Sequence, residues 1–339
     1  IMDERKQRIL RAIIEDYVKS AEPVGSRTIA KNYNLGISPA TVRNEMADLE
    51  DLGYLEKPHT SAGRIPSSKG YRLYVDSMMH QDPVENEDVK QIHSIWNDPQ
   101  LSGNEMLLHM ARLVSQISHS MSLLLAPGHD QAMLKYIHIL PLDAHQAVMV
   151  VITATGALDN ELMYFTSPVK ADELQRLAIQ FSNAVQNKLL RDITSAQISA
   201  IIAHIDGSKS VSLQIGETLL RAITKRRLFY SVGTTELLRQ PEFKTVEKVQ
   251  PVLSLLEEQQ ELGHILQDNS NKPIKIKIGS ENQMEALSDM SLIQTDFSQD
   301  NNQLGTLAIL GPTRMEYSRI INMLSYMKHL METMARNQT

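Results

Sequence analysis

The chain has 339 residues, of which 42% are hydrophobic and 22% charged, and its formal net charge is −6 at pH 7. This length is too great for one ordinary core and predicts two or three domains of a water-soluble protein. The chain contains no cysteine, which excludes disulfides, thiolate metal sites and a cysteine nucleophile. It has no apolar run that could span a bilayer, and the charged stretch from Asp3 to Arg11 lacks the apolar core of a signal peptide. We therefore expect a cytoplasmic protein with no membrane partner.

The first part of the chain predicts two helices and a turn. Apolar residues recur at helical spacing from Lys6 to Lys19, and residues 22–25 (EPVG) end that pattern. Ser26 is expected to cap a short second helix from Arg27 to Tyr33, and residues 34–37 then form a turn. A third helix follows directly, and three helices in this order indicate a helix-turn-helix.

The third predicted helix has the clearest start signal of the chain. Ser38 can cap the free backbone amides, and Pro39 stands at the first helical position, where its missing N–H costs nothing. Gly53 supplies a left-handed stop. One face of this helix is predicted to be apolar, with Val42, Met46, Leu49 and Leu52.

The opposite face of the third helix carries Thr41, Arg43 and Asn44. A helix in the major groove touches base edges mainly with its first turns, where arginine can bind guanine and asparagine can bind adenine through two hydrogen bonds. We therefore predict that these three residues contact bases.

A two-stranded wing is predicted after the third helix. Residues 54–56 and 64–66 form a hairpin around the loop 57–63, and a further helix is expected from Lys69 to Met79. Residues 1–76 hold 12 Lys and Arg against 11 Asp and Glu, a net charge of only +1, so DNA binding depends on a local basic face. Contacts to the DNA backbone or minor groove are predicted for Arg27, Thr28, Ser38, His59, Thr60, Ser61, Arg64 and Lys69.

The remainder of the chain predicts an α+β domain that is interrupted by an insertion. Residues 81–88 are polar, acidic and broken by proline, as in a linker. Helical patterns follow at 89–96, 104–125, 171–190, 195–205, 213–225, 245–267 and 314–334, and strand patterns at 134–140, 147–153, 161–166, 229–232, 274–278, 292–297 and 304–310. Strands, then helices, then strands again are typical of an interrupted α+β domain.

Several runs resemble the bacterial HrcA family of heat-inducible transcription repressors. The similar segments are 38–46 (SPATVRNEM), 52–55 (LGYL), 59–66 (HTSAGRIP), 70–72 (GYR), 233–238, 241–243 and 304–312 (LGTLAILGP). The match is dense in the first four segments, and the later ones extend the resemblance over the whole chain.

The resemblance implies a fold and a function. The fold would be a winged helix-turn-helix followed by a GAF-like α+β domain with an inserted dimerisation domain. The expected boundaries are 1–80 for the winged helix, 81–103 for a linker and short helix, 104–166 and 244–339 for the two GAF-like parts, and 167–243 for the insertion. The function would be that of a homodimeric repressor of heat-shock chaperone operons, which binds an inverted-repeat operator in double-stranded DNA and depends on the GroE chaperonin for activity.

Alternatives remain open. No metalloprotease, α/β-hydrolase or P-loop motif occurs and the 11 histidines are scattered, so we expect no enzyme, no cofactor and no metal site. The methionines of the last helix predict either a packed seam or an exposed face that a chaperonin recognises. The winged helix could also serve a ligand-gated regulator of other genes, or a module that docks partner proteins.

Overall fold

The computed structural model of the chain describes residues 2–59, 63–79, 82–101, 103–127, 132–154, 158–224, 227–266, 270–299 and 302–333. The chain divides into two compact units, one made of residues 1–125 and 229–339 and the other of residues 126–228. Within the described ranges, every helix is too short or too polar to cross a membrane.

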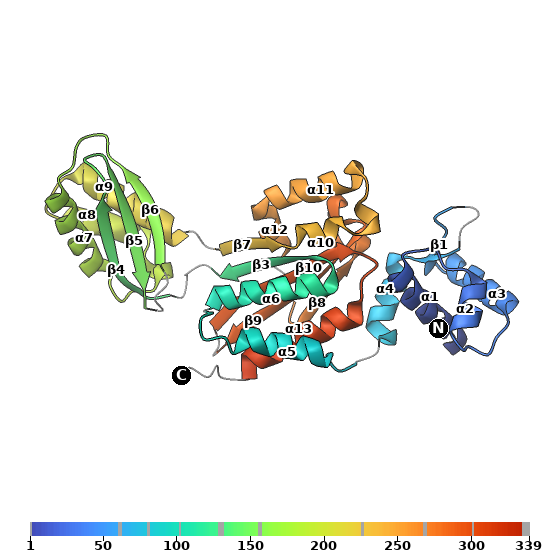
Figure 1. The fold of residues 1–339 in the computed structure, drawn as a ribbon. Coiled ribbons are helices and arrows are strands. Elements are labelled where there is room, and N and C mark those ends of the chain that lie inside the picture. Colours follow the sequence, from blue (N-terminus) through green and yellow to red (C-terminus); the bar gives the residue numbers. More distant parts are fainter. Residues whose placement is uncertain are drawn as a thin grey trace. The chain divides into compact units, whose positions relative to one another are not determined.

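The first unit begins with a winged helix-turn-helix (Figure 1). Its elements are α1 (Glu4–Ser20), α2 (Ser26–Asn32), α3 (Pro39–Asp51), β1 (Leu55–Glu56), β2 (Ile65–Pro66), α4 (Ser68–Leu73) and the π-helical turn η1 (Tyr74–Met78). The predicted order of helices and wing is therefore confirmed. Two local predictions were wrong: Gly25, not Ser26, is the N-cap of α2, and Leu52 is 47% exposed because the helix ends just before it.

A small core holds these helices together. Ile9 and Ile13 of α1, Ile29 of α2, and Val42 and Leu49 of α3 are completely buried. Each such side chain stabilises the fold by about 1.5–3 kcal/mol relative to an exposed one. The inner face of α3 is thus fixed by packing, which leaves its outer face free.

The rest of the first unit is a five-stranded sheet between two layers of helices, here called the GAF-like domain (residues 86–125 and 229–333). The strands β3 (Met121–Pro127), β7 (Arg227–Val232), β8 (Ile274–Ile278), β9 (Met290–Gln299) and β10 (Asn302–Pro312) lie in the order β7-β3-β10-β9-β8. The helices and helical turns are α5 (Asn86–Trp96), α6 (Gly103–Ser118), α10 (Thr234–Leu238), η4 (Pro241–Phe243), α11 (Val246–Glu257), α12 (Gln259–Ile265), η5 (Gly279–Asn282), η6 (Glu285–Leu287) and α13 (Tyr317–Thr333).

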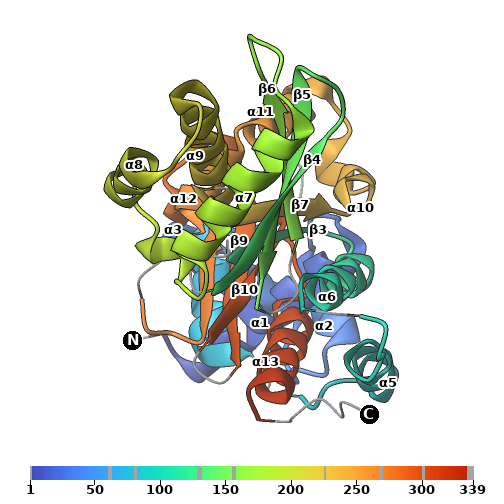
Figure 2. The ribbon, with the colours of Figure 1, turned by 90° about the vertical axis from the view of Figure 1, so that its left-hand side faces the viewer.

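Each face of this sheet packs against its own hydrophobic core. Leu124 packs in the core that includes α6 and α13, whereas its neighbours Leu123 and Leu125 pack in the core that includes α11 and α12. Figure 2 shows α5, α6 and α13 on one side of the sheet. Successive strand residues point to opposite faces, so a strand that is covered on both sides carries a continuous apolar run.

That continuous run explains a wrong prediction. The expected helix 104–125 ends at Ser118, and Met121–Pro127 form the strand β3. His119 adopts a left-handed backbone with φ of 49°, which ends the helix. An apolar run that follows an apolar helix face continues its pattern, and periodicity alone does not separate the two.

The predicted linker is also more ordered than expected. Helix α5 begins at Asn86, and Asp88 is only 2% exposed and accepts hydrogen bonds from Arg319 of α13. Residues 86–88 therefore belong to the GAF-like domain.

The second unit is a three-stranded sheet with helices on one face. The strands β4 (Leu134–Pro141), β5 (Gln146–Thr153) and β6 (Leu158–Tyr164) pair antiparallel in the order β4-β5-β6. The helices are α7 (Ala171–Val185), α8 (Ser195–His204) and α9 (Lys209–Thr224), with the turn η3 (Leu190–Asp192). Strand residues such as Ile137, Met149 and Met163 share a core with Phe181 of α7 and Ile215 of α9.

The predicted insertion, residues 167–243, differs from this unit at both ends. Strands β4–β6, predicted in the GAF-like domain, pair only with one another among the described residues, whereas residues 229–243 belong to the first unit. Alternating strands look the same whichever sheet they join, because pairing depends on contacts far apart in the sequence.

Candidate nucleic-acid interface

The start of α3 presents polar side chains on a capped and fixed helix. The Ser38 hydroxyl accepts a hydrogen bond from the Thr41 amide at 3.1 Å, and the two hydroxyl oxygens lie 3.0 Å apart. Arg43 and Asn44 are exposed one turn further on, while Val42 between them and the cap is buried. Arginine and asparagine are thus held on the free face of a rigid helix, as a base-reading helix requires.

A buried carboxylate ties α3 to α1. Glu45 is 9% exposed and accepts a hydrogen bond from Nζ of Lys6 at 2.7 Å, and the same ammonium lies 3.0 Å from Asp48. Hydrogen bonds to Glu45 and Asp48 raise the pKa of Lys6 above its usual value. This pair was not predicted from the sequence, although Glu45 stands among the apolar residues of the buried face of α3.

The wing is joined to the loop between α1 and α2. The amide of Val24 donates to the carbonyl of Arg64 at 2.8 Å, and the amide of Arg64 donates back to the carbonyl of Val24 at 2.9 Å. A Cβ atom on Gly63 would lie 2.4 Å from the Val24 oxygen, so only glycine fits there. The base of the wing therefore has a defined position in the winged helix.

Three side chains, one from the wing and two from the residues that follow it, contact the end of α3. Nε of Arg64 donates to Glu50 at 2.7 Å, the Ser67 hydroxyl donates to the Gly53 carbonyl at 2.7 Å, and Nζ of Lys69 donates to the Leu52 carbonyl at 2.8 Å. The Lys69 ammonium also lies 4.5 Å from the ring centre of Tyr54. Carbonyls at the end of a helix lack partners within the helix, so these contacts stabilise it as well as positioning the wing.

The structure leaves most of the predicted DNA contacts accessible. The exposed ones are Arg27, Thr28, Ser38, Arg43, Asn44, His59 and Lys69. Thr41 and Arg64 are partly buried, and the Arg64 guanidinium is already bound to Glu50. Thr60 and Ser61 lie outside the described residues.

The winged helix contacts the GAF-like domain through α4. Arg72 donates from Nε to Glu281 at 2.9 Å and from Nη2 to the Ile276 carbonyl at 2.7 Å. Burial opposes ionisation of Glu281, but hydrogen bonds from Arg72 and from the Ile278 amide lower its pKa below the usual value. Nearby, the rings of Tyr71 and Tyr317 lie 5.7 Å apart, and burial raises the pKa of both phenols.

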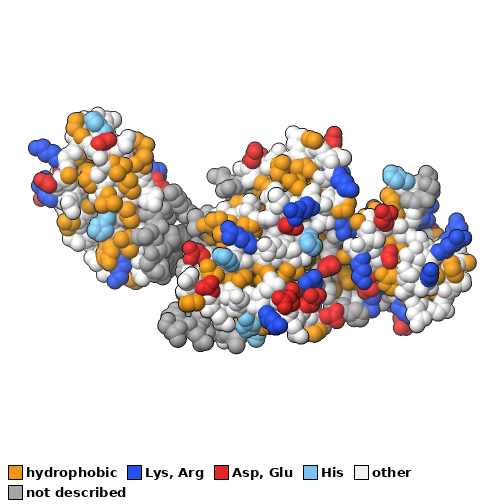
Figure 3. Space-filling model, viewed as in Figure 1, with side chains coloured by type: hydrophobic (Ala, Val, Ile, Leu, Met, Phe, Trp, Pro, Cys, Tyr) orange, Lys and Arg blue, Asp and Glu red, His pale blue; other side chains and the backbone are white. Residues whose placement is uncertain are grey.

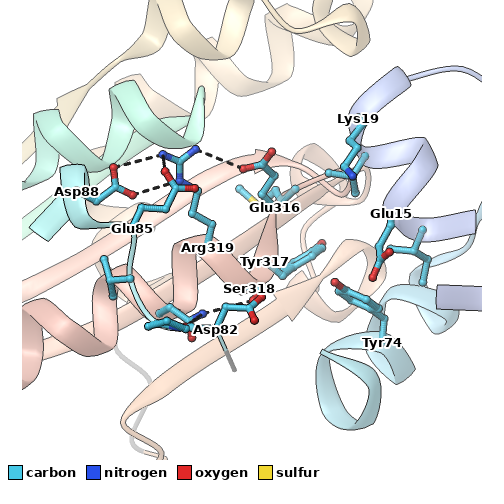
Figure 4. A pocket seen from close by; sticks show the side chains of 16 residues that line it. Glu15, Lys19, Tyr74, Asp82, Glu85, Asp88, Glu316, Tyr317, Ser318 and Arg319 are labelled. Atoms are coloured by element: carbon cyan, nitrogen blue, oxygen red, sulfur yellow. Dashed lines mark hydrogen bonds and ion pairs between the residues drawn. The ribbon is translucent and has the colours of Figure 1, made fainter. Parts of the chain in front are cut away.

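A cavity of about 320 Å³ is lined by α1, η1, the segment 82–88 and α13 (Figure 4). Glu15 and Lys19 of α1 line one side of it together with Tyr74, and Arg319, which is bound to Asp88, lines the other side. Of the predicted DNA contacts that the structure describes, none lines this cavity. Within the described ranges, no three metal-binding side chains gather to form a metal site.

Comparison with known proteins gives matches to both parts of the chain. The family model described as "Winged helix-turn-helix transcription repressor, HrcA DNA-binding" matches residues 2–79, and that described as "HrcA protein C terminal domain" matches residues 104–321. A heat-inducible transcription repressor HrcA of Moorella thermoacetica is 36% identical over 326 residues, covering 95% of each chain. One of Acetivibrio thermocellus is 39% identical over 341 residues, covering 98% of this chain and 95% of its own.

A solved structure, described as a crystal structure of a hypothetical protein at 2.2 Å resolution, has a similar fold. Its TM-score is 0.67 at 20% sequence identity, and the match covers 98% of both chains. Together with the winged-helix family model, it confirms the predicted fold of a winged helix followed by an α+β region.

Proposed function

The chain belongs to the HrcA family of heat-inducible transcription repressors, and we propose that it acts as a homodimer on an inverted-repeat operator of heat-shock chaperone genes. One winged helix would bind each half of the repeat, with α3 in the major groove. The observation that carries this proposal is the exposed, capped start of α3 with Arg43 and Asn44 on its free face. A dimer over a promoter would block the polymerase in the cytoplasm.

The proposed contacts are those predicted from the sequence apart from Arg64, whose guanidinium is bound to Glu50. Arg43, Asn44 and Thr41 would contact bases. Contacts to the DNA backbone or minor groove would come from Arg27, Thr28, Ser38, His59, Thr60, Ser61 and Lys69. Lys69 keeps two of its three ammonium protons for DNA, because one is donated to the Leu52 carbonyl.

An open sheet face supports the proposed dimer. The face of β4–β6 away from α7–α9 carries exposed Tyr136, Leu140, Leu162 and Tyr164, with Val148 and Val150 between them. In Figure 3 hydrophobic side chains gather over this sheet, whose helices lie behind it in Figure 1. An apolar face of this kind is typical of a subunit interface. We place the partner subunit of the dimer there.

The proposed link to the GroE chaperonin comes from the family resemblance of the sequence. Met323, Met327 and Met331 of α13 are fully buried, so they form a packed seam in the folded protein and not an exposed face. A chaperonin would therefore meet these methionines only on unfolded or partly folded chains. When other unfolded proteins occupy the chaperonin, less repressor would reach the folded state and the chaperone genes would be expressed.

Gel-shift binding tests the proposal directly. The purified protein is titrated onto an inverted repeat from a chaperone operon and onto a scrambled duplex of equal length, across a salt series with and without chaperonin. We expect preferential binding to the repeat and a larger active fraction with chaperonin. Equal binding to both duplexes would contradict the operator, and absence of salt-dependent binding would indicate a protein-docking module.

The change Arg43→Ala should lower operator affinity by about 1–3 kcal/mol and relax the sequence preference at one base pair of each half-site. Competition binding against operators substituted one base pair at a time measures both effects. Arg176→Ala, which removes an exposed arginine from the second unit, is the matched control and should leave binding unchanged. Equal losses on operator and scrambled DNA for Arg43→Ala would remove this residue from base readout.

A further inference from the structure

The guanidinium of Arg64 is engaged inside the winged helix. Its Nε donates to Oε2 of Glu50 at 2.7 Å, and the side chain is only 16% exposed. Glu50 lies in the last turn of α3, and its side chain is 29% exposed. This ion pair joins α3 to the residue directly before the wing strand β2.

The backbone of Arg64 is fixed at the same point. Its amide and its carbonyl both bind Val24, and Gly63 before it approaches the Val24 carbonyl too closely for any side chain. The position of Arg64 therefore sets where the wing leaves the winged helix, and Glu50 connects that position to α3.

We propose that Arg64 and Glu50 are positioning residues, which hold the wing at the angle to α3 that the operator requires, and that Arg64 does not bind DNA phosphate. This inference rests on the proposed DNA-binding function. If a phosphate drew Nε of Arg64 away, the carboxylate of Glu50 would lose this partner beside the polyanionic DNA, which is unfavourable.

Removal of Glu50 distinguishes phosphate binding by Arg64 from positioning of the wing, because the two roles predict opposite changes in DNA affinity. If Arg64 binds phosphate and Glu50 only lies near the DNA, Glu50→Ala removes a negative charge, frees the arginine and strengthens binding. If the pair positions the wing, Glu50→Ala weakens binding to the operator in spite of the favourable change in charge.

The experiment is a double-mutant cycle on the full-length protein. Operator affinity is measured across a salt series for the wild type, Glu50→Ala, Arg64→Ala and the double variant, with Glu50→Gln as a milder change. We expect each single variant to lose about tenfold in operator affinity, and the double variant to lose no more than either. The slope of log affinity against log salt should stay that of the wild type in all of them.

Three results would overturn the proposal. They are stronger binding by Glu50→Ala, additive losses in the double variant, or a salt slope that Arg64→Ala reduces by about one. Circular dichroism melting shows whether each variant is folded, and Glu50→Gln carries the test if the alanine variant is not.

Hydrogen exchange tests the pair without DNA. In Glu50→Ala and Arg64→Ala, the amides of residues 63–65 should exchange faster than in the wild type, since the base of the wing is no longer tied to α3. Unchanged exchange in both variants would contradict the positioning role. A wild-type protein that fails to bind the operator, while exchange responds as expected, would instead contradict the proposed function.

Discussion

Replacement of both Leu140 and Leu162 by aspartate should convert the protein to a monomer and lower operator affinity by about a hundredfold or more. The two leucines lie on the open face of β4–β6, where they are 54% and 40% exposed in the single subunit. In the proposed dimer, four new carboxylates would be buried without partners, and each such charge costs several kcal/mol. Sedimentation equilibrium measures the assembly, and gel shifts on a full operator and on a single half-site measure the consequence.

The helix layer of the same unit provides matched controls. Ile179 on α7 and Leu213 on α9 are 55% and 52% exposed, so Ile179→Asp and Leu213→Asp make the same chemical change on exposed apolar positions outside the open sheet face. These variants should remain dimeric. A dimer that survives the change of Leu140 and Leu162 would place the interface elsewhere. Both leucines are already exposed in the single subunit. The melting temperature of the variant should therefore fall only by the stabilisation that dimerisation gives the wild type.

The winged helix was predictable because its signals are local. A capping serine, proline at the first helical position and glycine after the last turn act within a few residues, and the structure places Ser38, Pro39 and Gly53 in these roles. Gly53 has φ of 79°, as the predicted left-handed stop requires. Short-range chemistry of this kind does not depend on what the helix packs against.

The sheets were less predictable because strand pairing is not local. The strand β3 follows α6 directly and pairs with β10, nearly two hundred residues later, to lie inside a sheet that is covered on both faces. Nothing in residues 121–127 distinguishes a doubly buried strand from the end of an apolar helix. The predicted insertion differs from the second unit for the same reason, since β4 to β6 alternate in either arrangement.

In the candidate site, the sequence predicted the exposed side chains correctly but did not predict which charged side chains form ion pairs within the protein. Arg43 and Asn44 are exposed as expected, because a helix with one apolar face must expose the other. Arg64 also looked like a surface cation, but its partner Glu50 lies 14 residues away across the wing. Ion pairs between separate elements depend on the final packing, which one sequence does not specify.

Removal of the Arg314 side chain should destabilise the first unit by about 2–4 kcal/mol. This arginine is 11% exposed and donates to Glu242 at 2.6 Å, to Gln240 at 2.7 Å and to the Val18 carbonyl at the end of α1 at 2.9 Å. Arg314→Ala would leave the Glu242 carboxylate and the Val18 carbonyl without this donor. The single tryptophan of the chain, Trp96, is buried in α5, so its fluorescence during urea unfolding reports on this unit alone.

Two further variants distinguish the contacts of Arg314 from its charge. Arg314→Lys keeps the positive charge but cannot reach three acceptors in fixed directions, so we expect most of the stability to be lost. Arg239→Ala removes an arginine whose side chain is 74% exposed and pairs with Glu236, and it should change stability by no more than about 0.5 kcal/mol. If Arg314→Ala behaved like Arg239→Ala, the contact between α1 and the GAF-like domain would not depend on this arginine. A loss with Arg314→Ala that Arg314→Lys fully restores would assign the effect to charge alone.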